Sequence, residues 1–292
     1  MDDHAMLTRY SETFELPPGV GLRDLLAAFE RVSDANPPAV AAIDEIIMAE
    51  RVSWTLNAEI TTPIGMGPHP IALYIHGGGW TTGTPRGYRR VAAEFAARGY
   101  LVVAPNYRRA PRHRFPGGFD DCRTAIDWVL THGPGLGGDI DRMVVVGDSA
   151  GANLAAAAVA CGQCAQAARA ILLFYGIFDF YQALPVIGPI IGGPTRDEQL
   201  YLHVDDFDSL RADPRLNPIL AADRLPPAFL AVGSRDPLLL QSRQMAAAIS
   251  RLGRSVESHV YDASPHGFLQ LPFTSSFTAG YDAADRFARS QF

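Results

Sequence analysis

Apolar and polar positions follow two alternating patterns along the chain. Short, continuous apolar runs indicate buried strands, and they occupy residues 71–75, 101–104, 143–147, 170–175, 228–232 and 258–261. Segments with the spacing of amphipathic helices lie between them, at residues 88–98, 119–131, 150–160, 241–252 and 278–289. Apolar strands that alternate with helices predict an α/β fold, with a mostly parallel sheet and helices on both faces.

Two segments depart from this alternation. Residues 1–50 contain a helical pattern at 21–33 but no strand pattern, and residues 51–63 are typical of an antiparallel edge strand or hairpin. The stretch at about 179–217 is long, and its apolar part, residues 185–194, argues against disorder. We therefore expect a core domain over residues 51–292, with a cap made from residues 1–50 and the insertion at about 179–217.

Composition and charge narrow the class of protein. The chain has 292 residues, 48% of them hydrophobic, and a net charge of -6, which is ordinary for a soluble globular protein and disfavours nucleic acid as a partner. No apolar run approaches the roughly 20 residues of a membrane span, and the amino terminus lacks the apolar core of a signal peptide. Three cysteines predict a reducing compartment, so we expect a cytoplasmic location.

The stretch Gly147-Asp148-Ser149-Ala150-Gly151 fits the pattern G-x-S-x-G. It follows a predicted strand and precedes a predicted helix, which is the context in which a sharp turn exposes the serine hydroxyl above a sheet. The flanking glycines permit a strained backbone at this turn. Ser149 is therefore a candidate nucleophile.

A second glycine-rich stretch, His76-Gly77-Gly78-Gly79-Trp80, directly follows the predicted strand at 71–75. Glycines leave backbone N–H groups uncovered, and aligned N–H groups can form an oxyanion hole for a tetrahedral intermediate. A nucleotide-binding loop is disfavoured, because the G-x-G-x-x-G spacing and the lysine of a phosphate-binding loop are both missing.

A catalytic serine requires a base and an orienting acid. His266, in the stretch SPHGF, follows the predicted strand at 258–261, and Asp236 follows the one at 228–232. Active-site residues of open α/β sheets gather at the carboxyl ends of the strands. Asp236 is the preferred acid and Asp262 is the alternative. The order Ser149, Asp236, His266 is typical of α/β-hydrolases.

Together these motifs resemble the bacterial hormone-sensitive-lipase-like carboxylesterases of the α/β-hydrolase superfamily. The resemblance rests on HGGGW at 76–80, YRRAPRHRFPGGFDDC at 107–122, GDSAGANLA at 147–155, DPRLNPI at 213–219, GSRDPL at 233–238 and HGF at 266–268. It implies an eight-stranded, mostly parallel sheet with a helical cap, and ester hydrolysis without a metal or another cofactor. It implies a catalytic triad of Ser149, Asp236 and His266. It also implies an oxyanion hole formed by the backbone N–H groups of Gly78, Gly79 and Ala150, with His76 and Gly77 supporting the glycine turn.

The chain departs from the family pattern at two places. Arg109 and Arg112 replace an apolar and an acidic residue of the common Y-R-L-A-P-E stretch, so that residues 107–112 read YRRAPR with Arg108 in its usual place. Leu239, Leu240 and Gln241 stand where acidic residues are common. Both changes concern local ion pairs and the lining near the pocket.

The sequence therefore predicts a serine carboxylesterase for small-molecule esters with small to medium apolar acyl or alcohol groups. The apolar residues Trp80, Val186, Ile187 and Ile190 are the candidate pocket lining. An arylformamidase-like amide or formamide hydrolase is the alternative on the same fold. A non-catalytic small-molecule receptor is the third reading, which the presence of His266 disfavours. The sequence leaves the choice between a monomer and a homodimer open.

Overall fold

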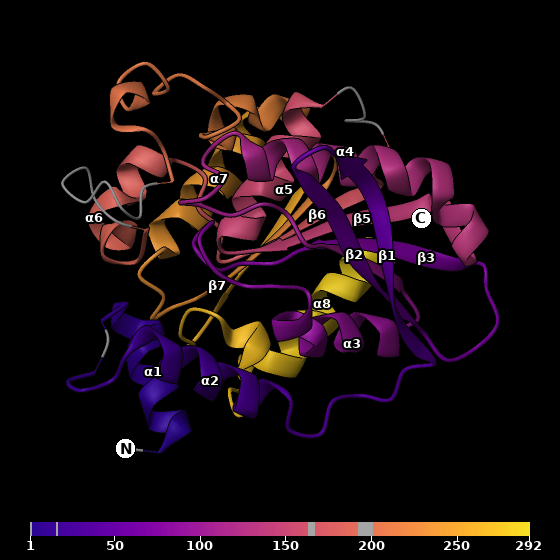
Figure 1. The fold of residues 1–292 in the computed structure, drawn as a ribbon, viewed down its shortest axis with the longest axis horizontal. Coiled ribbons are helices and arrows are strands. Elements are labelled where there is room, and N and C mark those ends of the chain that lie inside the picture. Colours follow the sequence, from indigo (N-terminus) through magenta and orange to yellow (C-terminus); the bar gives the residue numbers. More distant parts are fainter. Residues whose placement is uncertain (1, 16, 163–166, 192–200) are drawn as a thin grey trace.

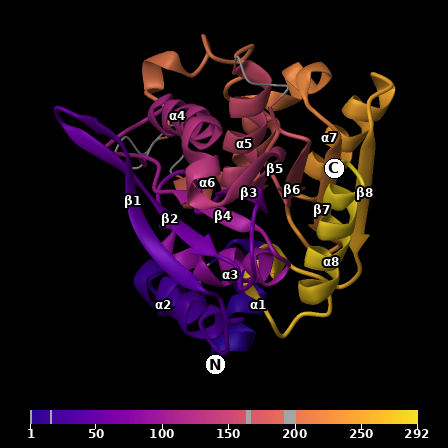
Figure 2. The ribbon, with the colours of Figure 1, turned by 90° about the vertical axis from the view of Figure 1, so that its right-hand side faces the viewer.

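One sheet of eight strands forms the centre of the molecule. The computed structural model describes residues 2–15, 17–162, 167–191 and 201–292. Within them the strands lie in the order β1-β2-β4-β3-β5-β6-β7-β8, so that β1 and β8 form opposite edges (Figure 2). β2 is antiparallel to both β1 and β4, and the remaining neighbours are parallel, as predicted. The strands are β1 (Ala42–Arg51), β2 (Trp54–Thr62), β3 (His69–Ile75), β4 (Leu101–Pro105), β5 (Gly138–Asp148), β6 (Ala170–Phe174), β7 (Ala228–Gly233) and β8 (Val256–Tyr261).

Helices cover both faces of this sheet, as predicted (Figure 1). Helices α3 (Arg89–Ala97) and α8 (Ser276–Arg289) bury their apolar sides against one face. Helices α4 (Gly117–His132), α5 (Ala150–Cys161) and α7 (Leu239–Arg251) pack on the other face. Residues 150–160 of α5 are all buried, which explains their alanine-rich sequence, since small side chains let a helix approach a sheet closely. None of the described helices combines the length and apolar character that a membrane crossing requires.

The sheet begins earlier in the chain than the sequence pattern suggested. The hairpin expected near residues 51–63 is present, but its first strand is β1, Ala42–Arg51, so the expectation of no strand within residues 1–50 is wrong. β1 is an edge strand with exposed residues on both faces, among them Asp44, Glu45 and Glu50. Its apolar positions therefore lack the alternation that a half-buried strand shows.

Two helices precede β1, namely α1 (Asp3–Thr13) and α2 (Leu22–Ser33). An apolar cluster joins the two helices to Leu271. Its members on α1 and α2 are Met6, Leu7, Leu25, Ala28 and Val32. Arg31 of α2 also donates to Asp3 of α1 at 2.8 and 2.9 Å. This pair of helices therefore forms a small unit with its own apolar contacts.

Helix α6 (Phe180–Ile191) follows β6 and lies at the same end of the sheet as α1 and α2 (Figure 1). It contains the first part of the apolar stretch at 185–194, and residues 192–194 lie outside the described residues. Short 3-10 helices complete the described structure: η1 (Arg86–Tyr88), η2 (Gly133–Leu136), η4 (Val204–Asp206), η5 (Pro218–Arg224) and η6 (Phe268–Gln270).

Candidate active site

The turn between β5 and α5 holds Ser149 in a strained conformation. Its φ of 52° and ψ of -121° are unusual for a residue with a side chain. Glycine is needed on both sides, since a Cβ on Gly151 would collide with the carbonyl oxygen of Ile75 and one on Gly147 would lie 2.5 Å from the carbonyl oxygen of Gly151. The Ser149 N–H donates to the carbonyl of Phe174 at 2.9 Å, which anchors the turn to β6.

Ser149, His266 and Asp236 form one chain of hydrogen bonds. His266 Nε2 lies 3.0 Å from Ser149 Oγ, and His266 Nδ1 lies 2.8 Å from Asp236 Oδ2. The Asp236 side chain is fully buried, and its Oδ1 accepts the N–H of Leu238 at 2.7 Å. In this arrangement the imidazole donates from Nδ1 to the carboxylate, which leaves Nε2 free to accept a proton from the serine.

Asp262, the alternative acid, lies apart from this chain. It is exposed, and its Oδ1 accepts a hydrogen bond from Ser234 Oγ at 3.2 Å. Ser234 Oγ in turn accepts the N–H of Ala263 at 2.8 Å, so the pair stabilises the turn after β8. Geometry therefore selects Asp236 as the partner of His266.

The glycine-rich loop after β3 lies beside the serine. Gly78 and Gly79 line the cavity that contains Ser149, and their φ values of 114° and 59° belong to the region that glycine adopts readily. A Cβ on Gly78 would collide with the carbonyl oxygen of Thr82. Ala150 is the first residue of α5, where helical N–H groups have no acceptor within the helix. Backbone donors from two elements thus flank Ser149.

His76 lies behind this loop and is completely buried. Burial lowers the pKa of His76 to about 3, so the ring is neutral, and its Nδ1–H donates to the carbonyl of Gly77 at 2.7 Å. The ring stacks on Tyr88 and Tyr107 at centroid distances of 5.2 and 4.4 Å. The Tyr107 hydroxyl also donates to the His76 carbonyl at 2.8 Å. These contacts hold the glycine turn in one conformation.

Asp148 is a site residue that the sequence analysis missed. Its Oδ1 accepts hydrogen bonds from the Tyr74 hydroxyl at 2.7 Å and from the Gly77 N–H at 2.8 Å, so it ties the serine turn to the glycine loop. Burial raises the pKa of Asp148 to about 6, although these two hydrogen bonds act in the opposite direction. The signal that could have identified it is an acidic residue directly after the apolar run at 143–147.

A cavity of about 340 Å³ opens above Ser149. Its apolar lining includes Ile187 of α6, and Trp80, Ile177 and Leu238 from the segments that follow β3, β6 and β7. Further apolar lining comes from Phe14 at the end of α1 and from Leu25 and Phe29 of α2.

Trp80 and Ile187 are thus found where the sequence placed them. Val186 is not among the lining residues, and this correction follows from helix geometry, since adjacent residues on α6 point in directions about 100° apart. The side chain of Ile190 lies outside the described residues. The residues from α1 and α2 escaped prediction because periodicity shows that a helix has an apolar face, and not what this face covers.

The departures from the family pattern have local partners. Arg109 donates to Asn106 Oδ1 at 2.7 Å and to the Tyr107 carbonyl at 3.0 Å, while Arg112 is exposed. Gln241 is buried, and its Oε1 accepts the N–H groups of Phe178 and Asp179 at 2.9 and 2.8 Å. Gln241 therefore fixes the loop that leads into α6.

Comparison with known proteins agrees with this geometry. Residues 72–270 match the family model described as the alpha/beta hydrolase fold. Carboxylesterase NlhH of Mycobacterium tuberculosis is 32% identical over 222 residues, which cover 69% of this chain and 67% of the relative. Ethyl acetate hydrolase of Pseudomonas putida is 30% identical over 209 residues, which cover 68% of this chain and 66% of the relative. A solved structure, the hyperthermophilic esterase from the archaeon Pyrobaculum calidifontis, has the same fold with a TM-score of 0.78, at 24% identity and over 99% of this chain and 96% of that chain.

The chain belongs to the α/β-hydrolase family. The predicted fold is confirmed by the eight-stranded sheet and by the solved esterase structures that share it. The resemblance to the hormone-sensitive-lipase-like carboxylesterases is confirmed as well, since the family model spans residues 72–270 and the two relatives described above are named as ester hydrolases.

Proposed function

We propose that this protein is a serine carboxylic ester hydrolase that acts through an acyl-enzyme. The observation that carries the proposal is the hydrogen-bond chain from Asp236 through His266 to Ser149, which ends in the cavity. The names of the relatives support the same class of reaction. The amide or formamide hydrolase alternative is not favoured by these names, and a receptor would not need the three groups in register.

Each step of the reaction has a group in place. His266 Nε2 takes the hydroxyl proton of Ser149 as the oxygen attacks the ester carbonyl, and the Gly78, Gly79 and Ala150 N–H groups stabilise the resulting oxyanion. The imidazolium then returns this proton to the leaving alcohol as the tetrahedral intermediate collapses to the acyl-enzyme. Water attacks the acyl-enzyme in the same way, which releases the acid and restores the serine. Asp236 holds the imidazole in the correct tautomer throughout.

The size and lining of the cavity support the proposal that the substrates are small-molecule esters with small to medium apolar groups. Its volume of about 340 Å³ lies at the lower end of the range for small-molecule sites. Ile187 of α6, Trp80 and the amino-terminal residues Phe14, Leu25 and Phe29 give the cavity apolar walls, as such groups require.

We also propose that a cap covers the active site. We assign the cap to α1, α2 and the insertion at about 179–217, because both parts contribute lining to the cavity above Ser149. The amino-terminal part of the cap ends before Ala42, where β1 joins the sheet of the catalytic domain. A cytoplasmic location remains a prediction from cysteine use, and a homodimer remains one of the two oligomeric states that the sequence allows.

A panel of p-nitrophenyl esters from acetate to palmitate, with N-formylkynurenine alongside, tests the reaction class. We expect turnover of the short and medium esters, little turnover of palmitate, and covalent labelling of Ser149 by a fluorophosphonate. Preferred hydrolysis of N-formylkynurenine would replace the esterase assignment with the formamide alternative. Absence of both labelling and turnover would refute a catalytic function.

A further inference from the structure

The carboxyl end of α1 contacts the candidate base directly. The backbone N–H of His266 donates to the carbonyl of Ser11 at 3.0 Å. The ring of Phe14 meets the His266 imidazole edge to face, with centroids 4.8 Å apart and planes at 90°. Both Ser11 and Phe14 are buried. One helical turn at the amino terminus thus touches the histidine through its backbone and through its ring.

The same turn also reaches the loop that carries the acid. Glu12 accepts a hydrogen bond from Arg235 at 3.0 Å, and Arg235 directly precedes Asp236. The Arg235 backbone N–H donates to the carbonyl of Ser264, which lies two residues before His266. Residues 11–14 therefore bridge the two loops whose side chains must meet in the triad.

Phe14 owes its position to the way in which α1 ends. Its φ of 56° is left-handed, and its N–H donates to the carbonyl of Tyr10 at 2.7 Å, which closes the helix. A non-glycine residue in this conformation is uncommon and indicates that its surroundings hold it there. The side chain is consequently directed into the site, where it lines the cavity with Tyr10 of the same helix.

His266 needs such support because it lies on a loop. It follows β8 and precedes Gly267, whose φ is 74°, and its side chain keeps some exposure to solvent. Its ring also contacts Tyr175 at a centroid distance of 4.8 Å, and Phe14 supplies a second aromatic contact. An imidazole that serves as base must stay within a fraction of an ångström of the productive position.

We propose that Phe14, together with the carbonyl of Ser11, is a positioning residue that holds His266 between Asp236 and Ser149, so that docking of α1 sets the catalytic rate. This inference rests on the proposed function. It assigns to the amino-terminal helix a role in the chemical step that is separate from its role as a wall of the cavity.

The test compares Phe14→Leu, which removes the ring but keeps an apolar side chain, with Phe14→Tyr, which keeps the ring. Phe292→Leu is the matched control, because it removes a ring by the same substitution at a contact with Tyr100 that lies outside the lining of the cavity. The measurements are kcat and KM for p-nitrophenyl acetate, and the rate of inactivation by a small fluorophosphonate, which needs the base but little of the pocket.

We expect Phe14→Leu to lower kcat and the inactivation rate together, by about ten- to a hundredfold, since a misplacement of about 1 Å has effects of this size. KM should change by less than about threefold. Phe14→Tyr should recover most of the rate, whereas Phe292→Leu should leave kcat, KM and the inactivation rate at their wild-type values. The low-field proton resonance of His266 Nδ1–H should weaken or broaden in Phe14→Leu alone.

The outcome that overturns the proposal is a Phe14→Leu protein with a changed KM but with the inactivation rate and the resonance of the wild type and of Phe292→Leu. If Phe14→Leu does not fold, Glu12→Gln and Arg235→Gln serve instead, since Arg235 is exposed and Glu12 is partly exposed, so that both variants should fold. Each should lower kcat by about twofold, and the double variant should lower it no further. Two unchanged rates would then refute the bridge. A wild-type protein without turnover or labelling would refute the proposed function itself, which separates the two failures.

Discussion

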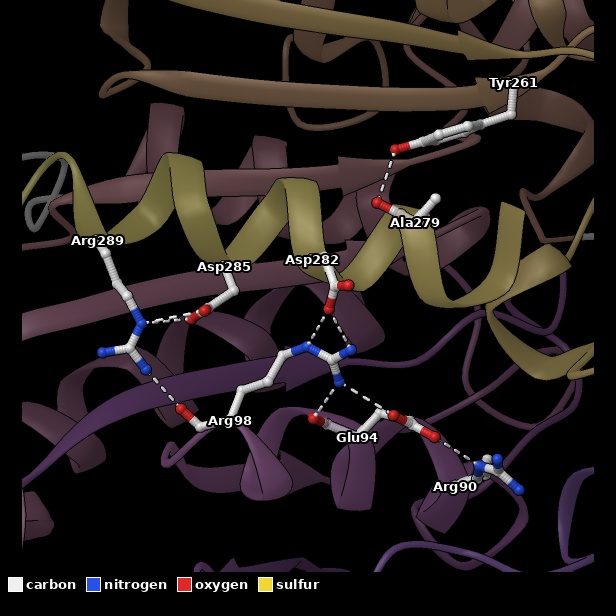
Figure 3. Close-up of polar contacts among 8 residues, drawn as sticks. All are labelled: Arg90, Glu94, Arg98, Tyr261, Ala279, Asp282, Asp285 and Arg289. Atoms are coloured by element: carbon white, nitrogen blue, oxygen red, sulfur yellow. Dashed lines mark hydrogen bonds and ion pairs between the residues drawn. The ribbon is translucent and has the colours of Figure 1, made fainter. Parts of the chain in front are cut away.

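Two networks of charged and polar side chains lie on different parts of the molecule, and they differ in whether their charged groups have partners of opposite charge. Between α3 and α8, three arginines each meet a carboxylate, namely Arg90, Arg98 and Arg289 (Figure 3). Arg98 joins Glu94 at 3.0 Å and Asp282 at 2.6 Å, and Arg90 contacts the other oxygen of Glu94 at 3.0 Å. Hydrogen bonds to Asp282 and Glu94 raise the pKa of Arg98, although its partial burial acts to lower it. This network compensates its charges.

Among the described residues, no lysine or arginine pairs with the two carboxylates of the network around Ser149. The Asp236 carboxylate faces an imidazole that must be neutral to act as base, and buried Asp148 meets only neutral donors, the Tyr74 hydroxyl and the Gly77 N–H. Burial raises the pKa of Asp148 to about 6 and lowers that of His76 to about 3. The first network thus stabilises the folded protein. The second lowers the stability of the folded protein, because it keeps buried polar groups aligned and reactive.

The largest expected effect comes from the serine. Ser149→Ala should lower kcat by roughly 10⁵-fold or more, because the nucleophile is lost, while the free energy of unfolding changes by less than about 1 kcal/mol. Ester turnover and urea unfolding of the same preparation measure both quantities. Fluorophosphonate labelling that persists in this variant would contradict the assignment.

Removal of the acid should have the next largest effect. Asp236→Asn should lower kcat by up to about 10⁴-fold with the protein folded, because the imidazole then adopts the wrong tautomer. Asp262→Asn is the matched control and should cost at most about tenfold, since Asp262 pairs with Ser234. The acid assignment is wrong if the two variants exchange these results.

Asp148 should make stability depend on pH. A carboxyl group whose pKa is raised to about 6 on folding keeps its proton at pH values where the unfolded chain has lost it, so stability falls as the pH rises from about 4 to about 7. The loss should approach 3 kcal/mol, from roughly 1.4 kcal/mol per unit. Asp148→Asn does not titrate, so its stability relative to wild type should rise over this interval. An equal difference in the free energy of unfolding between Asp148→Asn and wild type at pH 4 and at pH 8 would contradict this prediction.

The smallest effect should come from the network between α3 and α8. Arg98→Met should lower the free energy of unfolding by about 1–3 kcal/mol, because it leaves Glu94 with one fewer partner, and kcat/KM should stay at the wild-type value. Asp282→Asn should cost less, since Asp282 is half exposed. A loss of activity at full stability would show that the two networks are coupled.

Much of the fold and of the triad could be predicted from the sequence. Fully buried parallel strands such as β3 and β6 appear as continuous apolar runs, and the turn at Ser149 has a distinctive glycine spacing. The elements that were missed have weaker patterns. α1 is largely polar on its outer side, and α6 contains Pro185, Pro189 and Gly188, which ordinarily argue against a helix.

The contacts of the site were harder to predict than its chemistry. Ser149 and His266 could be assigned because their local motifs are characteristic. Phe14 and His266 are far apart in the sequence, and the residues around each of them do not indicate that the two rings meet. Val186 and Ile187 could not be separated without the orientation of α6 around its axis.

The packing of α1 against Leu271 and His266 has a consequence for biosynthesis. α1 and α2 are translated before the strands of the sheet, whereas Leu271 and His266 are translated after the last strand, β8. Until translation has passed β8, the α1–α2 cluster lacks Leu271, and Phe14 and Ser11 lack the histidine that they contact. A nascent chain that ends before β8 therefore contains Ser149 without its base, so hydrolytic activity requires translation past His266.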